Sequence, residues 1–329
     1  MYEPRFVNRV PELENLHKLA TRGSALPIFL YGPEGCGKTR LLKEFVKKFN
    51  GISIYVDALE KEKLDKALLT NPAIGELRKL MQDLVSKFTE PVGAFLVDKL
   101  MPIVENIVTK TTIENKPLVI IVDDVVRAIG TEKIEWYIKW LYELGKKLVE
   151  DYRPSSILII ATTSEGQSLD LVLRHTYASI RLLWNLHKDA LDELARELGV
   201  PHEVSIDELW HVTGGNPRIL IEIAHDYAWN INAWLSMLKK KLLKIIISIK
   251  SKGLENELRL VIKDPDAIYH YPSQKMEELY KILVEENLII YKYIPTITEK
   301  EIEEDPELGI GKYYAWQIPA YRDIISNIL

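Results

Sequence analysis

Cysteine is nearly absent from this sequence, and so is any long uninterrupted apolar run. Its one cysteine, Cys36, excludes an internal disulfide framework and is typical of a reducing cytoplasm. The most apolar stretch, residues 242–249, contains Lys244 and is far shorter than the roughly 20 residues of a membrane-spanning helix. The first eight residues lack the apolar core of a secretory signal. We therefore expect a soluble, cytoplasmic protein that has no membrane partner.

Excess positive charge is also missing. The formal net charge of -5 at pH 7 argues against a protein that coats nucleic acid through its global charge. Internal repeats and low-complexity tracts are absent from the 329 residues, of which 47% are hydrophobic and 28% charged. This composition is ordinary for a globular protein, and the length favours two or three domains.

Short apolar runs alternate with helical patterns in the first half of the chain. The runs are continuously apolar, which predicts parallel strands covered on both faces of a sheet. These strands are expected at residues 27–31, 52–56, 118–122, 157–161 and 179–183. Together with the intervening helices they predict an α/β doubly wound core over residues 1–186, with a helical insertion at 57–117.

After residue 186 the pattern changes to short helices, which predicts a helical lid over residues 187–232. Residues 233–329 are expected to form a winged helix, because helices are followed by two short β-rich pieces. Six lysines occur between residues 239 and 252, and no acid occurs between Asp226 and Glu255. A phosphate-facing stripe for DNA and a solvated helix face are equally good interpretations of these lysines.

The segment GPEGCGKT matches the phosphate-binding pattern G-x-x-x-x-G-K-[ST]. Its glycines allow backbone N–H groups to turn inward around phosphate oxygens, Lys38 supplies a charge for the β and γ phosphates, and the Thr39 hydroxyl ligates magnesium. A chance glycine-rich turn is the alternative, but an apolar strand precedes the segment and an amphipathic helix follows it, with its positive end toward the phosphates. We predict that ATP or ADP with Mg²⁺ is bound by Gly32, Pro33, Glu34, Gly35, Cys36, Gly37, Lys38, Thr39 and Arg40.

The apolar run LVIIVDD ends in two carboxylates. In P-loop enzymes the acid at this strand end holds magnesium, a role that we assign to Asp123. Asp124 then lies where it could orient and polarise the attacking water. Capping of the following helix is the alternative for both acids. A second strand end, ATTS, offers the hydroxyls of Thr162 and Thr163 to the γ-phosphate or the water, and Thr163 is our candidate; ordinary strand-end polarity is the alternative.

These motifs, in this order, resemble the archaeal ATPase family in the STAND and AAA-like branch of P-loop NTPases. The resemblance rests on FVNRVPELENL, GPEGCGKT, VIIVDD, ATTS and TGGNPRIL, and covers roughly residues 6–227. It extends more loosely to KYYAWQIPAYRDII at residues 312–325. It implies a sheet of strand order 5-1-4-3-2 and an adenine pocket that involves Phe6, Asn8 and Arg9.

The same resemblance implies roles for residues of the lid. Pro217 begins a lid helix beside the nucleotide, and Arg218 resembles the sensor 2 arginine of AAA-type motors, which contacts the γ-phosphate. The GGNP segment is equally a helix stop followed by a helix start. Arg174 matches an arginine often found in the family and is the arginine-finger candidate, with a surface ion pair as the alternative. The family commonly has Asp-Glu where this chain has Asp123-Asp124, so slow hydrolysis is expected.

The sequence therefore predicts an ATP-hydrolysing switch or motor that acts on DNA, on a protein partner or on another copy of itself. One alternative is a nucleotide-dependent scaffold without hydrolysis, which the Asp-Asp pair keeps open. A small-molecule kinase is the other, and the few arginines of the lid argue against it. ATP turnover without an acceptor would exclude the scaffold and disfavour the kinase.

Overall fold

The computed structural model describes residues 4–60, 67–71, 115–163 and 166–329. Most of the helical insertion predicted at 57–117 lies outside these residues. The chain divides into two compact units, which we call the sheet unit and the helical unit. The sheet unit comprises Val10–Tyr31 and Lys38–Arg181, and the helical unit comprises Met1–Arg9, Gly32–Gly37 and Leu182–Leu329.

The sheet unit is an α/β structure around a six-stranded sheet of order β3-β2-β4-β5-β1-β6. Strand β5 pairs in parallel with β1 and β4, and β4 pairs in parallel with β2, so the sheet is mostly parallel. The strands are β1 (Ile28–Tyr31), β2 (Ile52–Asp57), β3 (Leu68–Asn71), β4 (Pro117–Asp123), β5 (Ser156–Thr162) and β6 (Ser179–Leu182). The five strands predicted from the sequence are all present.

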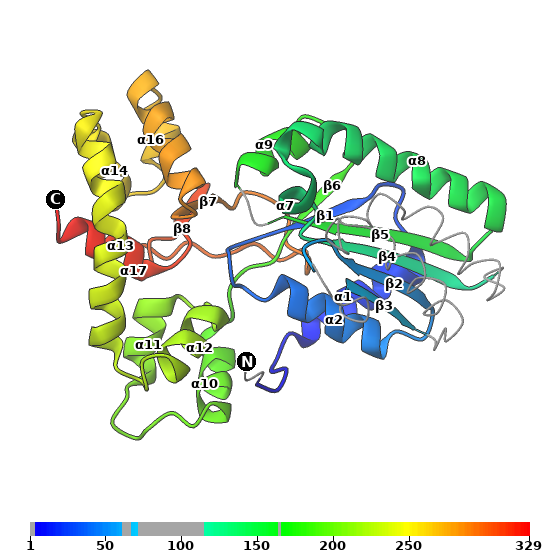
Figure 1. Cartoon of the computed structure of the whole chain (residues 1–329), viewed down its shortest axis with the longest axis horizontal. Helices are drawn as coiled ribbons and strands as arrows, with labels where there is room; N and C mark the ends of the chain where they lie inside the picture. Colours follow the sequence, from blue (N-terminus) through cyan, green and yellow to red (C-terminus); the bar gives the residue numbers. More distant parts are fainter. Residues whose placement is uncertain (1–3, 61–66, 72–114, 164–165) are drawn as a thin grey trace. The chain divides into compact units, whose positions relative to one another are not determined.

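Helices cover both faces of this sheet. Figure 1 shows α1 and α2 against one face and α8 along the other. Because both faces are covered, every residue of β1 is buried, as are all residues of β4 after its first. The helices are α1 (Val10–Arg22), α2 (Lys38–Lys48), α7 (Val125–Ile129), α8 (Ile134–Tyr152) and α9 (Gly166–Leu173), with a 3-10 turn at Thr131–Lys133.

Strand β3 corrects the expectation that residues 57–117 are helical. Leu68–Asn71 pairs antiparallel with β2, with Tyr55 opposite Leu69. The edge of β2 would otherwise present unpaired backbone groups, and the added strand satisfies them. The residue preferences of this segment did not predict a strand, because a four-residue strand is stabilised by its partner strand more than by its own sequence.

A hydrophobic core of the helical unit runs through both segments predicted as lid and C-terminal domain and includes Leu186, Leu220, Trp234 and Ile325. Its elements are α10 (Lys188–Glu197), α11 (Ile206–Thr213), α12 (Pro217–His225), α13 (Ile231–Ser251), α14 (Glu255–Lys263), α15 (Ala267–His270), α16 (Gln274–Glu285), β7 (Ile289–Tyr291), β8 (Tyr314–Trp316) and α17 (Pro319–Ser326). Strands β7 and β8 form an antiparallel pair after α16. Among the described helices, none combines the length and apolar character needed to cross a membrane.

The GGNP segment joins two helices of this unit. Helix α11 ends at Gly214, which adopts a left-handed conformation. Helix α12 begins with Asn216 as its N-cap, whose side chain accepts the N–H of Ile219, and with Pro217 in the first turn. The interpretation of this segment as a helix stop followed by a helix start is confirmed.

Candidate nucleotide site

Among the described residues of the sheet unit, Asp123 is the most enclosed carboxylate, with 1% of its surface exposed. It ends β4, directly opposite Asp57 of β2. One oxygen, Oδ2, accepts the hydroxyl of Tyr55 at 2.6 Å, and the other, Oδ1, accepts the hydroxyl of Thr162 at 2.5 Å. Three neighbouring strands, β2, β4 and β5, therefore each contribute one member of a hydrogen-bonded set at the carboxyl edge of the sheet.

Burial and the charge of Asp123 raise the pKa of the Tyr55 hydroxyl above its usual value, so Tyr55 remains a hydrogen-bond donor. Its ring also lies 5.3 Å from the ammonium of Lys43, which pairs with Asp57 at 3.5 Å. Each carboxylate oxygen of Asp123 has acceptor capacity beyond these two hydroxyls. The two hydroxyls thus orient Asp123 and leave its oxygens able to accept further hydrogen bonds.

Asp124 adopts a left-handed backbone conformation, with φ of 53°, although it is not glycine. Its N–H donates to the hydroxyl of Thr162 at 2.8 Å, and its side chain makes no capping hydrogen bond to α7. A non-glycine residue in this conformation is strained and persists where the surroundings hold it in place. The side chain of Asp124 therefore does not cap α7, contrary to the capping alternative.

The pKa of Asp124 is raised above the usual carboxyl value, first by burial and second by the charge of Asp123. The positive charges of Arg127 and Lys38 act in the opposite direction. Lys38, the first residue of α2, is itself buried, with 8% of its surface exposed. The sheet unit therefore brings together one buried lysine and two carboxylates, all from the predicted site. Thr39 and Arg40 follow Lys38 in the first turn of α2 and are half-buried.

The remainder of the phosphate loop, Gly32–Gly37, belongs to the helical unit. Arg9 is buried, and its Nη2 donates to the carbonyl of Cys36 at 2.8 Å and to that of Trp184 at 2.7 Å. The thiol of Cys36 lies 3.4 Å from the carbonyl of Leu183. Arg9, predicted for the adenine pocket, thus cross-links the loop to Trp184.

The start of α12 lies against the same loop. Gly35 has φ of +83°, and a Cβ atom there would lie 2.7 Å from Cβ of Arg218 and 2.9 Å from Oδ1 of Asn216. Only glycine fits a position that combines this conformation with such close neighbours. Pro217 approaches Gly37, where a Cβ atom would be 3.9 Å from its Cγ. The helical unit thus brings Pro217 and Arg218 to the loop.

The remaining four residues of the predicted site are Thr163, Arg174, Phe6 and Asn8. Thr163 is buried after β5, and its N–H donates to the carbonyl of Leu30 at 3.1 Å. Arg174 is exposed after α9, where its charge acts on Asp170. Phe6 is half-buried and Asn8 is exposed.

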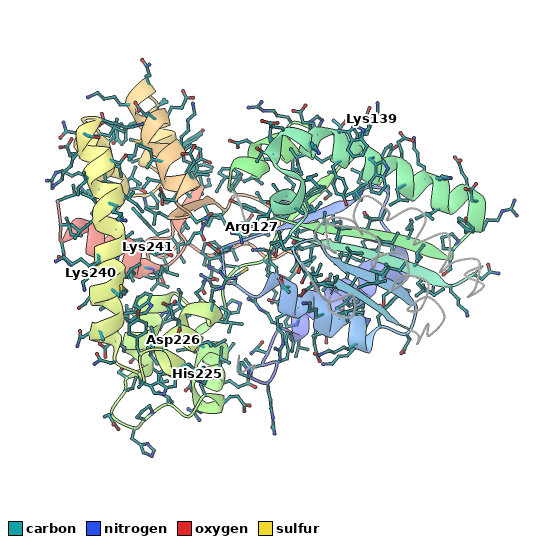
Figure 2. All side chains as sticks on the ribbon, in the orientation of Figure 1. Arg127, Lys139, His225, Asp226, Lys240 and Lys241 are labelled. Carbon is teal, nitrogen blue, oxygen red and sulfur yellow. The ribbon has the colours of Figure 1, made fainter. Side chains whose placement is uncertain are left out.

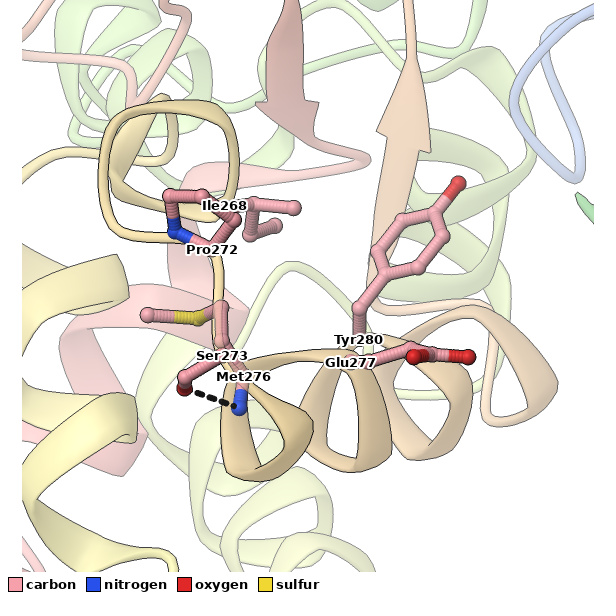
Figure 3. A pocket seen from close by; sticks show the side chains of 6 residues that line it. All are labelled: Ile268, Pro272, Ser273, Met276, Glu277 and Tyr280. Carbon is pink, nitrogen blue, oxygen red and sulfur yellow. Dashed lines mark hydrogen bonds between the residues drawn. The ribbon is translucent and has the colours of Figure 1, made fainter.

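A hollow of about 420 Å³ opens at the start of α16 (Figure 3). It is lined by Ile268, Pro272, Ser273, Met276, Glu277 and Tyr280. The hydroxyl oxygen of Ser273 accepts the N–H of Met276 as the N-cap of the helix, as the dashed line in Figure 3 shows. The predicted phosphate loop contributes no residue to this hollow.

A comparison with protein families matches residues 6–223 to ATPase domains predominantly from Archaea. The chain belongs to this family. The matched span begins at Phe6 and ends within α12, and it includes the phosphate loop, both carboxylates and the GGNP segment.

Among curated proteins, no sequence matches this chain. Among solved structures, one similar chain is the ORC2 protein of Aeropyrum pernix, whose structure was determined in ADPNP-ADP complexes. The two are 17% identical with a TM-score of 0.40, and the alignment covers 70% of this chain and 66% of that chain, just under two thirds of its length.

Several neighbours of the candidate site escaped prediction from sequence. Tyr55 lies in the middle of an apolar strand, and no pattern distinguishes it from a core tyrosine. Thr162 was considered beside Thr163, and it is Thr162 that contacts Asp123. Asn185 and Gln317, which contact the loop or its neighbours, stand outside every recognised nucleotide motif. Gln317 does lie within the tail segment that resembles the family, and this was the one available signal.

Proposed function

We propose that this chain binds ATP with Mg²⁺ at residues 32–39 and hydrolyses it slowly, as a switch of the STAND and AAA-like type. The observation that carries the proposal is the buried Asp123, oriented by Tyr55 and Thr162 at the end of β4. The sheet supports the assignment to this branch. Without β3, and starting from β6, the five remaining strands follow the order 5-1-4-3-2 that the resemblance implies.

The proposed phosphate contacts use the loop amides, the N-terminus of α2 and Lys38. The Thr39 hydroxyl and the Asp123 carboxylate are oxygen donors of the kind that Mg²⁺ prefers, and Asp123 keeps acceptor capacity for a bound water or the ion. When bound, the ion supplies positive charge for the phosphate oxygens as the β–γ bond breaks. Phe6, Asn8 and Arg9 are proposed to border the adenine, and Thr163 and Arg174 to assist at the γ-phosphate.

Asp124 is the proposed base that orients the attacking water. To test it, phosphate release and ATP affinity are measured for wild type and Asp124→Asn in the presence of Mg²⁺, without any phosphate acceptor. Turnover is expected to fall by roughly 100-fold or more, the usual contribution of a positioned base, while ATP affinity is retained. A wild type that binds ATP but releases no phosphate would instead identify a nucleotide-dependent scaffold.

In the pH profile of ATP turnover, the acid limb, where activity is lost as the pH falls, is expected at a higher pH than an ordinary aspartate would give. Asp124 must be deprotonated to act, and its pKa is raised by burial and by Asp123, so activity is lost as pH falls through that raised pKa. Arg127→Ala removes a positive charge that lowers the pKa of Asp124, and should move the limb further upward; Figure 2 labels this residue. An acid limb at the usual carboxyl pKa would contradict the assignment.

The partner is proposed to bind the C-terminal part of the helical unit, where α14, α15, α16 and the β7–β8 pair give the element order of a winged helix. DNA is favoured by the lysines of α13, of which Figure 2 labels Lys240 and Lys241. Of these five lysines and Lys252, which directly follows α13, only Lys252 forms an ion pair among the described residues, with Glu278 at 2.8 Å. Stimulation of ATP turnover by duplex DNA, weakening with salt, would identify nucleic acid as the partner class.

A further inference from the structure

Glu34, the third residue of the phosphate loop, is held at three points by the helical unit. Its N–H donates to Oε1 of Gln317 at 2.8 Å, and its carbonyl accepts from Nδ2 of Asn216 at 2.8 Å. Its carboxylate accepts from Nη1 of Arg218 at 3.0 Å. Backbone and side chain are thus tied to three residues that lie 182 or more positions away in sequence.

The residues that hold the backbone of Glu34 are themselves fixed. Asn216 is buried, and its side-chain oxygen caps α12 through the N–H of Ile219. Asn185 connects the two holders, since its Oδ1 accepts from Asn216 at 3.1 Å and its Nδ2 donates to the carbonyl of Gln317 at 2.9 Å. The position of the Glu34 carboxylate next to Arg218 is therefore set by a buried amide network.

The ion pair between Glu34 and Arg218 is different in character. Its side chains are 33% and 60% exposed, so solvent screens their attraction and the pair is easily exchanged. A guanidinium binds carboxylate and phosphate oxygens with the same fork geometry. A phosphoryl group carries more charge than a carboxylate and offers more acceptor oxygens, so it is the stronger ligand for Arg218.

We infer that Glu34 is an internal competitor for Arg218 and sets the preference of the site for ATP over ADP. Without a nucleoside triphosphate, the Glu34 carboxylate pairs with the Arg218 guanidinium. When ATP binds, its γ-phosphate replaces the carboxylate as the partner of Arg218. ADP has no γ-phosphate, so Arg218 stays on Glu34. This inference rests on the proposed nucleotide binding at residues 32–39, and it assigns to Glu34 a role that the phosphate-loop pattern, which accepts any residue at this position, does not specify.

The exchange also gives the nucleotide an effect on α12. Arg218 is the second residue of α12, two positions after the cap Asn216, which holds the carbonyl of Glu34. Moving its side chain from the loop to the nucleotide changes what the first turn of α12 contacts. Because binding couplings are reciprocal, a change that stabilises the Glu34–Arg218 pair should weaken ATP binding, by at most the factor by which it stabilises the pair.

The test is a double-mutant cycle on nucleotide affinity. Dissociation constants for ATP and for ADP, both with Mg²⁺, are measured by isothermal titration calorimetry for wild type, Glu34→Gln, Arg218→Ala and the double variant. Glu34→Gln should raise the ratio of ATP to ADP affinity by about 5-fold or more, the scale of a typical coupling between sites. In the Arg218→Ala background the same substitution should leave that ratio unchanged, because no guanidinium remains to be released.

Glu208→Gln is the control, since Glu208 is an exposed carboxylate in the first turn of α11, in the same unit; its ATP to ADP ratio should equal that of wild type. Nucleotide binding with a ratio that Glu34→Gln does not raise would overturn this inference alone. An equal rise in the Arg218→Ala background would also overturn it, because charge removal would then act without Arg218. A wild type that binds neither nucleotide would overturn the proposed function as well.

Discussion

Lys38→Ala is expected to weaken the binding of both ATP and ADP by about 100- to 1,000-fold, and turnover should fall with it. Lys38 is 8% exposed at the start of α2, where its charge already acts on Asp124. Removing one partner of a buried charge pair costs about 3–5 kcal/mol, and each 1.4 kcal/mol corresponds to tenfold in affinity. Titration calorimetry with each nucleotide in the presence of Mg²⁺ measures the effect directly.

Lys47→Ala is the matched control, because Lys47 belongs to the same helix but is exposed and pairs only at 3.7 Å with Glu44 among its described ion pairs. It should bind both nucleotides as wild type does. Equal affinities for wild type and Lys38→Ala would place the nucleotide away from the phosphate loop and remove the basis of the proposed function.

The parts of the structure that were predictable from sequence are those decided by local physical chemistry. A continuously apolar run such as β4 indicates a strand covered on both faces, and its burial agrees. Asn216 followed by Pro217 indicates a helix start, because the amide caps and the proline has no N–H to lose. The proposed phosphate loop was recognisable for the same reason, since its pattern has the spacing that an anion-binding turn requires.

The parts that were not predictable depend on contacts between distant residues. Tyr55 reaches Asp123 across 68 positions, and Gln317 reaches Glu34 across 283. Nothing near Tyr55 in sequence differs from an ordinary strand, and the only signal near Gln317 is the loose resemblance of residues 312–325 to the family. Strand β3 is a similar case, because its existence depends on the open edge of β2. Such features are decided by pairing between residues far apart in sequence, and a single sequence does not show which residues pair.

Gly215→Ala is expected to destabilise the helical unit by roughly 2–5 kcal/mol. Gly215 has φ of +79°, where an alanine costs about 1–2 kcal/mol. A Cβ atom there would also lie 1.9 Å from the carbonyl oxygen of Leu186, and such overpacking costs typically about 1–3 kcal/mol. The two backbones are already joined, since the N–H of Leu186 donates to the carbonyl of Gly215 at 2.9 Å, so neither can move aside alone.

Gly199→Ala separates these two causes. Gly199 has nearly the same conformation, with φ of +74°, but a Cβ atom there would meet nothing within 4 Å. Urea unfolding of this variant should therefore show only the conformational cost of about 1–2 kcal/mol. Gly215 also precedes Asn216, which holds Glu34, so Gly215→Ala should weaken ATP binding whereas Gly199→Ala should not. Equal losses of stability in the two variants would mean that the segment around Leu186 yields to the added methyl group, and that the close approach of the two backbones does not constrain the loop.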